Sequence, residues 1–151
     1  MKNAPLDLFL LTLFIALAGV SVPLSGCSRT AGETSSSPPA QSIIKDVSPV
    51  QASAPIQKNQ GNAGYVILDV RTPQEYADGH LSGAINVDYS ASDFRDAINH
   101  LDKSKTYLVY CRTGVRSAAA SQIMAELGFK DIYNMTGGIT DWQAAGLPVV
   151  K

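Results

Sequence analysis

VYCRTGVRSAAA, residues 109–120, joins an apolar run to an alanine-rich segment. The apolar run predicts a buried strand, and the alanine-rich segment predicts a helix that begins near Ser117. The few residues between them must curl over the start of that helix, where backbone N–H groups converge and attract anions. Cys111 begins this turn, at the carboxyl end of the strand, where open α/β sheets bind their ligands. The stretch therefore favours an α/β fold with an anion-binding turn around a cysteine.

The chain around this stretch alternates short apolar runs with helical patterns, as βα units around a parallel sheet do. Most of the apolar runs are continuous, which is typical of strands covered on both faces. The expected strands are Ile43–Asp46, Tyr65–Asp69, Ala84–Val87, Tyr107–Tyr110 and Asp131–Tyr133.

Several helix signals lie between these runs. Ser48 and Thr72, each followed by proline, are expected N-caps, and Glu75 would complete a capping box with Thr72. Pro55 is expected to end the first of these helices within two turns. Gly128 suits the left-handed residue that ends a helix. Two buried helix stripes are expected from the spacing of Phe94, Ala97, Ile98 and Leu101, and of Ala120, Ile123, Met124 and Leu127.

The first 27 residues have the pattern of an export signal: Lys2, an apolar run over residues 8–20, and small residues before Cys27. Leu24-Ser25-Gly26-Cys27 resembles the lipobox of bacterial lipoproteins, which implies removal of residues 1–26 and a lipid on Cys27. The apolar run is short for a transmembrane helix, so a permanent spanning anchor is disfavoured. Ordinary secretory cleavage, which would leave Cys27 as a free thiol, is the alternative.

Residues 27–42 are rich in Ser, Thr and Pro and are expected to be a disordered tether, followed by one domain over residues 43–151. The expected location is extracytoplasmic, lipid-anchored to a bacterial membrane. In a Gram-negative cell this means the periplasmic face, and Ser28 resembles the sorting residue of outer-membrane lipoproteins.

Charge and cysteine content restrict the function. Twelve Lys and Arg against 13 Asp and Glu, with no basic run, exclude nucleic acid as an expected partner. The chain has two cysteines, and a lipidated Cys27 cannot form a disulfide, so Cys111 has no expected partner in the chain. Cys111 is then a reactive thiol, a thiol that pairs with another chain, or a buried, inert one. The helix start, the turn amides, Arg112 and Arg116 all favour the thiolate.

Three stretches, in order and spacing, resemble the signatures of a single-domain rhodanese: ILDVRTPQEYADGHLSGAINV at 67–87, CRTGVRS at 111–117 and GGITDWQAAGLPV at 137–149. The resemblance implies a five-stranded parallel sheet flanked by helices on both faces. It also implies a thiosulfate sulfurtransferase, in which Cys111 takes the outer sulfur of a small anionic donor, releases sulfite and passes sulfur from its persulfide to a thiol or cyanide. No cofactor and no metal ion are implied. The substrate-binding loop would comprise Arg112, Thr113, Gly114, Val115, Arg116 and Ser117.

The length of the loop separates related activities. Similar phosphatases and arsenate reductases place five residues between Cys and Arg, whereas here Arg116 comes one residue earlier and Ser117 takes the sixth place. A phosphatase is therefore disfavoured. A non-catalytic rhodanese module for sulfur carriage or protein docking stays open as the alternative. A thiol–disulfide redox protein is disfavoured because there is no C-x-x-C pair.

The roles of six other residues are less specific. Asp69 and Arg71 lie at the end of the second expected strand, where they would either help to bind the substrate or form a structural ion pair or loop brace. His80 is expected to brace a turn, and Trp142 to anchor packing. Gly137-Gly138 suits a close backbone approach to the cysteine loop.

Overall fold

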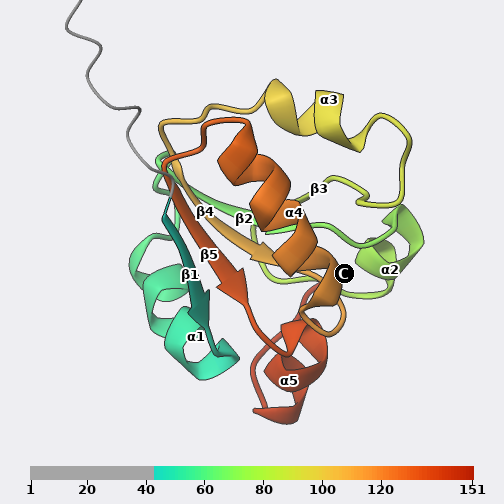
Figure 1. Ribbon diagram of the computed structural model, residues 1–151. Coiled ribbons are helices and arrows are strands. Elements are labelled where there is room, and N and C mark those ends of the chain that lie inside the picture. The colour runs from blue at the N-terminus through green and yellow to red at the C-terminus, as the bar shows by residue number, and fades with distance from the viewer. Residues whose placement is uncertain (1–42) are drawn as a thin grey trace, which may run out of the picture. The chain divides into compact units, whose positions relative to one another are not determined.

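The central element is a five-stranded parallel sheet with the strand order β1-β5-β4-β2-β3 (Figure 1). The computed structural model describes residues 43–151, so the expected signal peptide, Cys27 and the tether lie outside the described residues. The elements, in chain order, are β1 (Ile43–Val47), α1 (Pro49–Lys58), β2 (Tyr65–Asp69), α2 (Pro73–Asp78), β3 (Ala84–Asn86), α3 (Phe94–Asn99), β4 (Thr106–Tyr110), α4 (Val115–Glu126), β5 (Asp131–Met135) and α5 (Gly138–Ala144).

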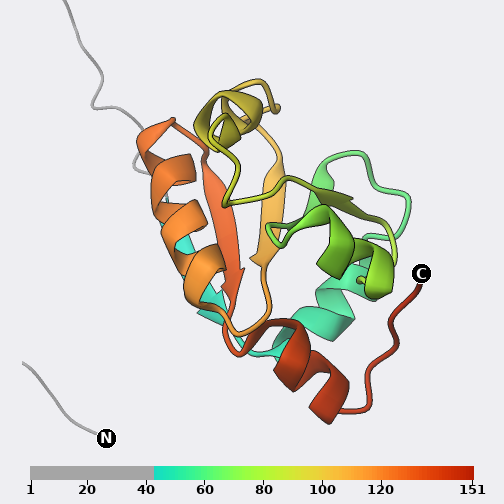
Figure 2. The same cartoon turned by 90° about the vertical axis from the view of Figure 1, so that its right-hand side faces the viewer.

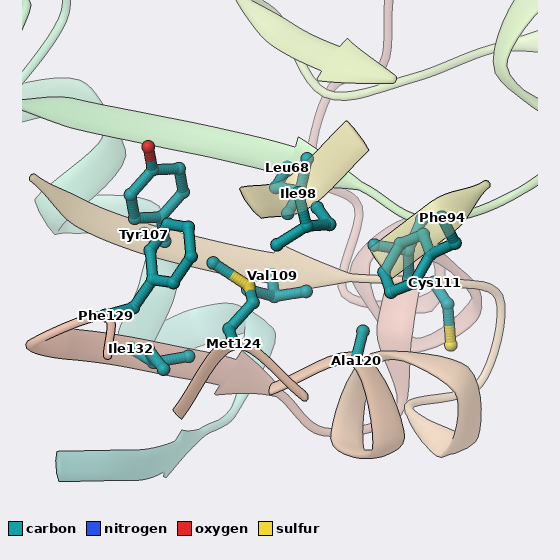
Figure 3. Packing of buried hydrophobic residues seen from close by; sticks show 11 residues of the cluster. Leu68, Phe94, Ile98, Tyr107, Val109, Cys111, Ala120, Met124, Phe129 and Ile132 are labelled. Atoms are coloured by element: carbon teal, nitrogen blue, oxygen red, sulfur yellow. The ribbon is translucent and has the colours of Figure 1, made fainter. Parts of the chain in front are cut away.

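Helices cover both faces of this sheet, as predicted. α3 and α4 lie on one face, and α1, α2 and α5 supply side chains to the other (Figures 1 and 2). On the first face, α3 and α4 pack onto residues of β2, β4 and β5 (Figure 3), and each fully buried aliphatic side chain contributes about 1.5–3 kcal/mol. The buried residues of this cluster are Leu68, Val70, Phe94, Ile98, Tyr107, Val109, Cys111, Ala120, Met124, Phe129 and Ile132.

The expected strands agree with the observed ones in number and place, with differences of one or two residues at their ends. The largest difference is at β5, which continues past Tyr133 to Met135 because Asn134 and Met135 still pair with β1. Asn134 is polar, so it breaks the apolar pattern from which the strand was predicted. Both expected helix stripes are at least partly buried.

The caps also agree with expectation. The side chains of Ser48 and Thr72 each accept a hydrogen bond from the backbone N–H three residues on. The side chains of Gln51 and Glu75 in turn accept from the backbone N–H of Ser48 and Thr72, so both helix starts have a full capping box. Gly128 has a φ of +91° and follows Leu127, the C-cap of α4, as its helix-ending role requires.

The expectation that Pro55 ends the first helix within two turns is wrong, because α1 continues through it to Lys58. Proline lacks the N–H that would bond the carbonyl of Gln51, but both residues are exposed, so water can serve that carbonyl. Buried Ala52 and Ile56 hold the helix on the sheet, and Asn59 closes it by donating to the Pro55 carbonyl from its backbone and side chain, at 3.0 and 2.9 Å. Within residues 43–151, none of the helices is long and apolar enough to cross a lipid bilayer.

Candidate active site

The turn between β4 and α4 surrounds the sulfur of Cys111. β4 is the central strand, and Cys111 follows its last residue with only 1% of its surface exposed. Its sulfur lies on the side of the turn that leads into α4 (Figure 3). The backbone N–H of Gly114 donates to Sγ at 3.2 Å, and the amides of Thr113 and Ser117 also act on the acidity of the thiol. The turn thus places N–H donors of its own backbone around one sulfur atom.

These donors change the acidity of the thiol. Burial raises the pKa of Cys111, but the backbone N–H and hydroxyl of Ser117, with the amides of Thr113 and Gly114, outweigh it and bring the pKa below its usual value. The turn therefore favours the thiolate more than burial alone would, which is the direction that a cysteine nucleophile requires.

Arg116 is held by a carboxylate from α2. Its two terminal nitrogens donate to the two oxygens of Glu75 at 2.8 Å each. The same carboxylate accepts from the backbone N–H of Thr72 at 3.1 Å, so one side chain both caps α2 and fixes the cysteine turn. The hydrogen bonds from Arg116 lower the pKa of Glu75 to about 2. Bonding to Glu75 and, to a smaller extent, the charge of the Cys111 sulfur raise the pKa of Arg116.

Arg112 is free by comparison. Its side chain is exposed, and none of the ion pairs within residues 43–151 includes it. Arg112 lines an open cleft between α2 and α5, where Thr140 and Gln143 are also found. A further cavity of about 320 Å³ beneath α1 contains no residue of the cysteine turn.

Asp69 and Arg71 form a buried ion pair, with 2.6 Å between the Arg71 Nη2 and the Asp69 carboxylate. Arg71 also donates to the carbonyl of Gly79 at 2.7 Å, so the pair braces the chain on both sides of α2. The geometry favours the structural alternative for these two residues. His80 likewise braces a turn, since its ring stacks on Tyr76 at 3.7 Å.

α5 begins directly against the cysteine turn. The N–H groups of Ile139 and Thr140 donate to the carbonyls of Cys111 and Arg112, at 2.9 and 3.1 Å. Gly138, with a φ of +58°, makes this approach possible, because a Cβ there would collide with both carbonyl-bearing residues. Trp142 is buried and donates to the Pro148 carbonyl, as a packing anchor does.

Two residues near the turn were not predicted from the sequence as part of the site. Glu75 was recognised only as a helix cap, and its bond to Arg116 joins positions 41 residues apart. Asn134 accepts a hydrogen bond from Ser117 at 2.7 Å, and its one sequence signal was a polar residue within an apolar strand. Among residues 43–151, no three His, Cys, Asp or Glu side chains gather as metal ligands would.

A parallel sheet whose central strand leads into a turn around a buried cysteine defines an α/β domain with a candidate thiol site. The family model of the rhodanese-like domain matches residues 52–145, and the chain belongs to the rhodanese family.

Similar proteins agree with this assignment. The thiosulfate sulfurtransferase GlpE of Ectopseudomonas mendocina is 38% identical over 104 residues, covering 68% of this chain and 88% of that protein. The chloroplastic thiosulfate sulfurtransferase 16 of Arabidopsis thaliana is 38% identical over 96 residues, covering 57% of this chain and 80% of that protein. The crystal structure of a rhodanese-related protein from Thermoplasma volcanium has a TM-score of 0.59 and 33% identity, covering 70% of this chain and 97% of that one.

Replacing Gly138 by alanine should reduce the free energy of unfolding by more than about 3 kcal/mol, because the new Cβ meets the backbone of Cys111 and Arg112 in a left-handed conformation. Urea unfolding measures the change. Gly146→Ala is the matched control, since its φ is +72° and nothing lies within 4 Å of its Cβ position. That variant should lose only about 1 kcal/mol. Equal losses in the two variants would contradict the close approach of α5.

Acid should weaken the bond between Glu75 and Arg116. Because the pKa of Glu75 falls on folding from 4.5 to about 2, the unfolded chain binds more protons than the folded chain between these pH values. The stability that the Glu75–Arg116 ion pair contributes is therefore lost as the pH falls from 4.5 to about 2. Glu75→Gln should lower stability by about 1 kcal/mol at pH 6 and leave it nearly unchanged at pH 2, as followed by thermal unfolding.

The matched control for this pH dependence is Glu126→Gln. Glu126 pairs with Arg95 at 2.9 Å, but the two side chains are 61% and 54% exposed. The control should stay within about 0.5 kcal/mol of the parent chain at every pH. If Glu75→Gln behaves in the same way as this control, the ion pair does not carry the acid dependence.

Proposed function

We propose that the chain is a sulfurtransferase that moves sulfane sulfur from thiosulfate, or a similar small anion, to a thiol or cyanide through a persulfide on Cys111. The observation that carries the proposal is the ring of N–H donors around the buried sulfur, with Gly114 N at 3.2 Å. The names of the similar proteins, thiosulfate sulfurtransferases, support the same activity.

In the first step, the Cys111 thiolate attacks the outer sulfur of thiosulfate. A bond forms between Sγ and that sulfur, the S–S bond of thiosulfate breaks, and sulfite leaves with the electron pair. In the second step, an acceptor thiolate attacks the outer sulfur of the persulfide, and Cys111 leaves as a thiolate again. Neither step needs a general acid, because sulfite and the thiolate are stable anions.

The turn supplies what this cycle requires. The negative charge is on Sγ before the first step and on the outer sulfur after it, and converging N–H groups stabilise charge in both places. Arg116 is paired with the ionised Glu75 carboxylate, so its guanidinium group holds the turn in shape and is not free to bind the donor. Arg112 is exposed in the cleft and is the cation that attracts the donor.

The proposed location is the outer side of a bacterial membrane, through a lipid on Cys27. Its support is the sequence Leu24-Ser25-Gly26-Cys27 after an apolar run. The cycle at Cys111 does not depend on this anchor.

Intact-mass spectrometry tests the persulfide directly. The full chain carrying Cys27→Ser, which leaves Cys111 as its single cysteine, is reduced and then treated with thiosulfate. The mass should rise by one sulfur atom, and cyanide should remove it. Cys111→Ser should show no gain. Sulfur loading on the Cys111→Ser chain, or none on the parent with any small sulfane donor, would contradict the proposal and favour a non-catalytic module.

Replacing Arg112 by alanine should raise the KM for thiosulfate about tenfold, since one charge-assisted contact to the donor is lost. The rate of sulfur transfer from the loaded enzyme to the acceptor should change little. Lys130→Ala, which removes an exposed positive charge after α4, is the control and should keep the KM. Steady-state kinetics at two salt concentrations measure both variants. An unchanged KM in Arg112→Ala would show that Arg112 does not bind the donor.

A further inference from the structure

A line of polar side chains runs from the edge of the sheet to the cysteine turn. Asp46, on the edge strand β1, accepts a hydrogen bond from Asn134 Nδ2 at 2.8 Å. Asn134 Oδ1 in turn accepts from the hydroxyl of Ser117 at 2.7 Å. Asn134 and Ser117 are 4% and 0% exposed, and hydrogen bonding from Ser117 lowers the pKa of the Cys111 thiol.

The first bond decides which way round the amide lies. A carboxylate can only accept hydrogen bonds, so Asp46 takes the NH₂ group of Asn134 and leaves its carbonyl oxygen facing Ser117. That oxygen can only accept, so the Ser117 hydroxyl must donate to it. Asp46 thereby sets the direction of the hydrogen bond two side chains away.

Ser117 has one hydroxyl proton, which lies on the bond to Asn134 at 2.7 Å, and an ionised Cys111 sulfur would be a further acceptor for it. When Cys111 is a thiol, the proton can stay on the bond to Asn134. When Cys111 is a thiolate, the sulfur and the amide oxygen compete, and the one that loses remains buried without that donor. The carbonyl of Gly114, at 3.1 Å from the Ser117 oxygen, is the weaker third acceptor.

We propose that Asn134, oriented by Asp46, is a positioning residue that competes with the Cys111 sulfur for the hydroxyl proton of Ser117 and so limits the ionisation of the cysteine. It rests on the proposed function in one respect: once the persulfide forms, the charge moves to the outer sulfur, and the Ser117 proton can return to Asn134. The pair then favours loading of the cysteine over its free thiolate.

The other charged groups around the sulfur are separate from this line. Arg112 and Arg116 belong to the turn and α4, Glu75 of α2 is bonded to Arg116, and the charge of Asp88 acts on Arg116. None of them contacts Asn134 through a hydrogen bond or ion pair in the described part of the chain. Substitutions at Asn134 and Asp46 therefore leave these charges in place.

The test is the rate of alkylation by iodoacetamide as a function of pH, on the full chain carrying Cys27→Ser. Asn134→Ala removes the competing acceptor and should lower the apparent pKa of Cys111 by roughly 0.5–1 pH unit. Asp46→Ala releases the amide, which can then turn and donate to Ser117, and should shift the pKa in the same direction by less. Asp46→Asn keeps an acceptor for Asn134 and should stay close to the parent.

A double-mutant cycle separates competition from general disturbance of the site. Ser117→Ala should raise the apparent pKa of Cys111, and Asn134→Ala should then cause no further shift in that background. Lys45→Gln is the control for the pairing of β1 with β5, because Lys45 contacts Tyr133 but not this line, and it should leave the pKa unchanged.

Three results would overturn the proposal: a raised pKa in Asn134→Ala, a shift that persists in the Ser117→Ala background, or an unchanged pKa in Asp46→Ala. The last variant is at an exposed position, so it tests the proposal even where Asn134→Ala fails to fold. Alkylation needs no sulfur donor, so these results are independent of whether thiosulfate loads Cys111.

Discussion

The site depends on hydrogen-bond donors that lower the pKa of a thiol which water scarcely reaches. Burial alone would raise the pKa of Cys111, and the opposing stabilisation comes from hydrogen-bond donors of a single short turn. That turn holds its shape through contacts at both ends. α5 donates to its first carbonyls from one side, and Glu75 of α2 binds Arg116 from the other. Both contacts are made at the carboxyl edge of the sheet, where parallel strands bring distant segments together.

The fold could be predicted well because its signals are local. Continuous apolar runs located the strands, capping residues located the starts of two helices, and the residues around Cys111 predicted its ring of amides. Pro55 shows the limit of such rules. Proline destabilises a helix locally, but the burial of Ala52 and Ile56 against the sheet offsets this loss of stability. The residues of α1 alone do not reveal that the helix packs on the sheet.

The parts of the site that escaped prediction all join distant positions. Glu75 satisfies a local rule as a helix cap, and nothing in its own segment indicates that the same oxygens bind Arg116. Asn134 and Asp46 are paired through the contact of β1 with β5, 88 residues apart in the chain. Such bonds follow from strand order, which a periodic pattern does not specify. A polar residue inside an apolar strand is the one trace they leave in the sequence.

The turn directs its hydrogen-bond donors at the cysteine sulfur and its second arginine at a carboxylate. A phosphate-binding loop of this kind needs its arginine directed at the oxyanion, whereas here both terminal nitrogens of Arg116 donate to the Glu75 carboxylate. The amide of Gly114 instead donates to Sγ, and the amides of Thr113 and Ser117 help to lower the pKa of the Cys111 thiol. In the proposed function the turn therefore stabilises charge on sulfur, and the exposed Arg112 attracts the anionic donor. In the proposed cycle the same turn serves each successive anion, thiolate and persulfide, without moving.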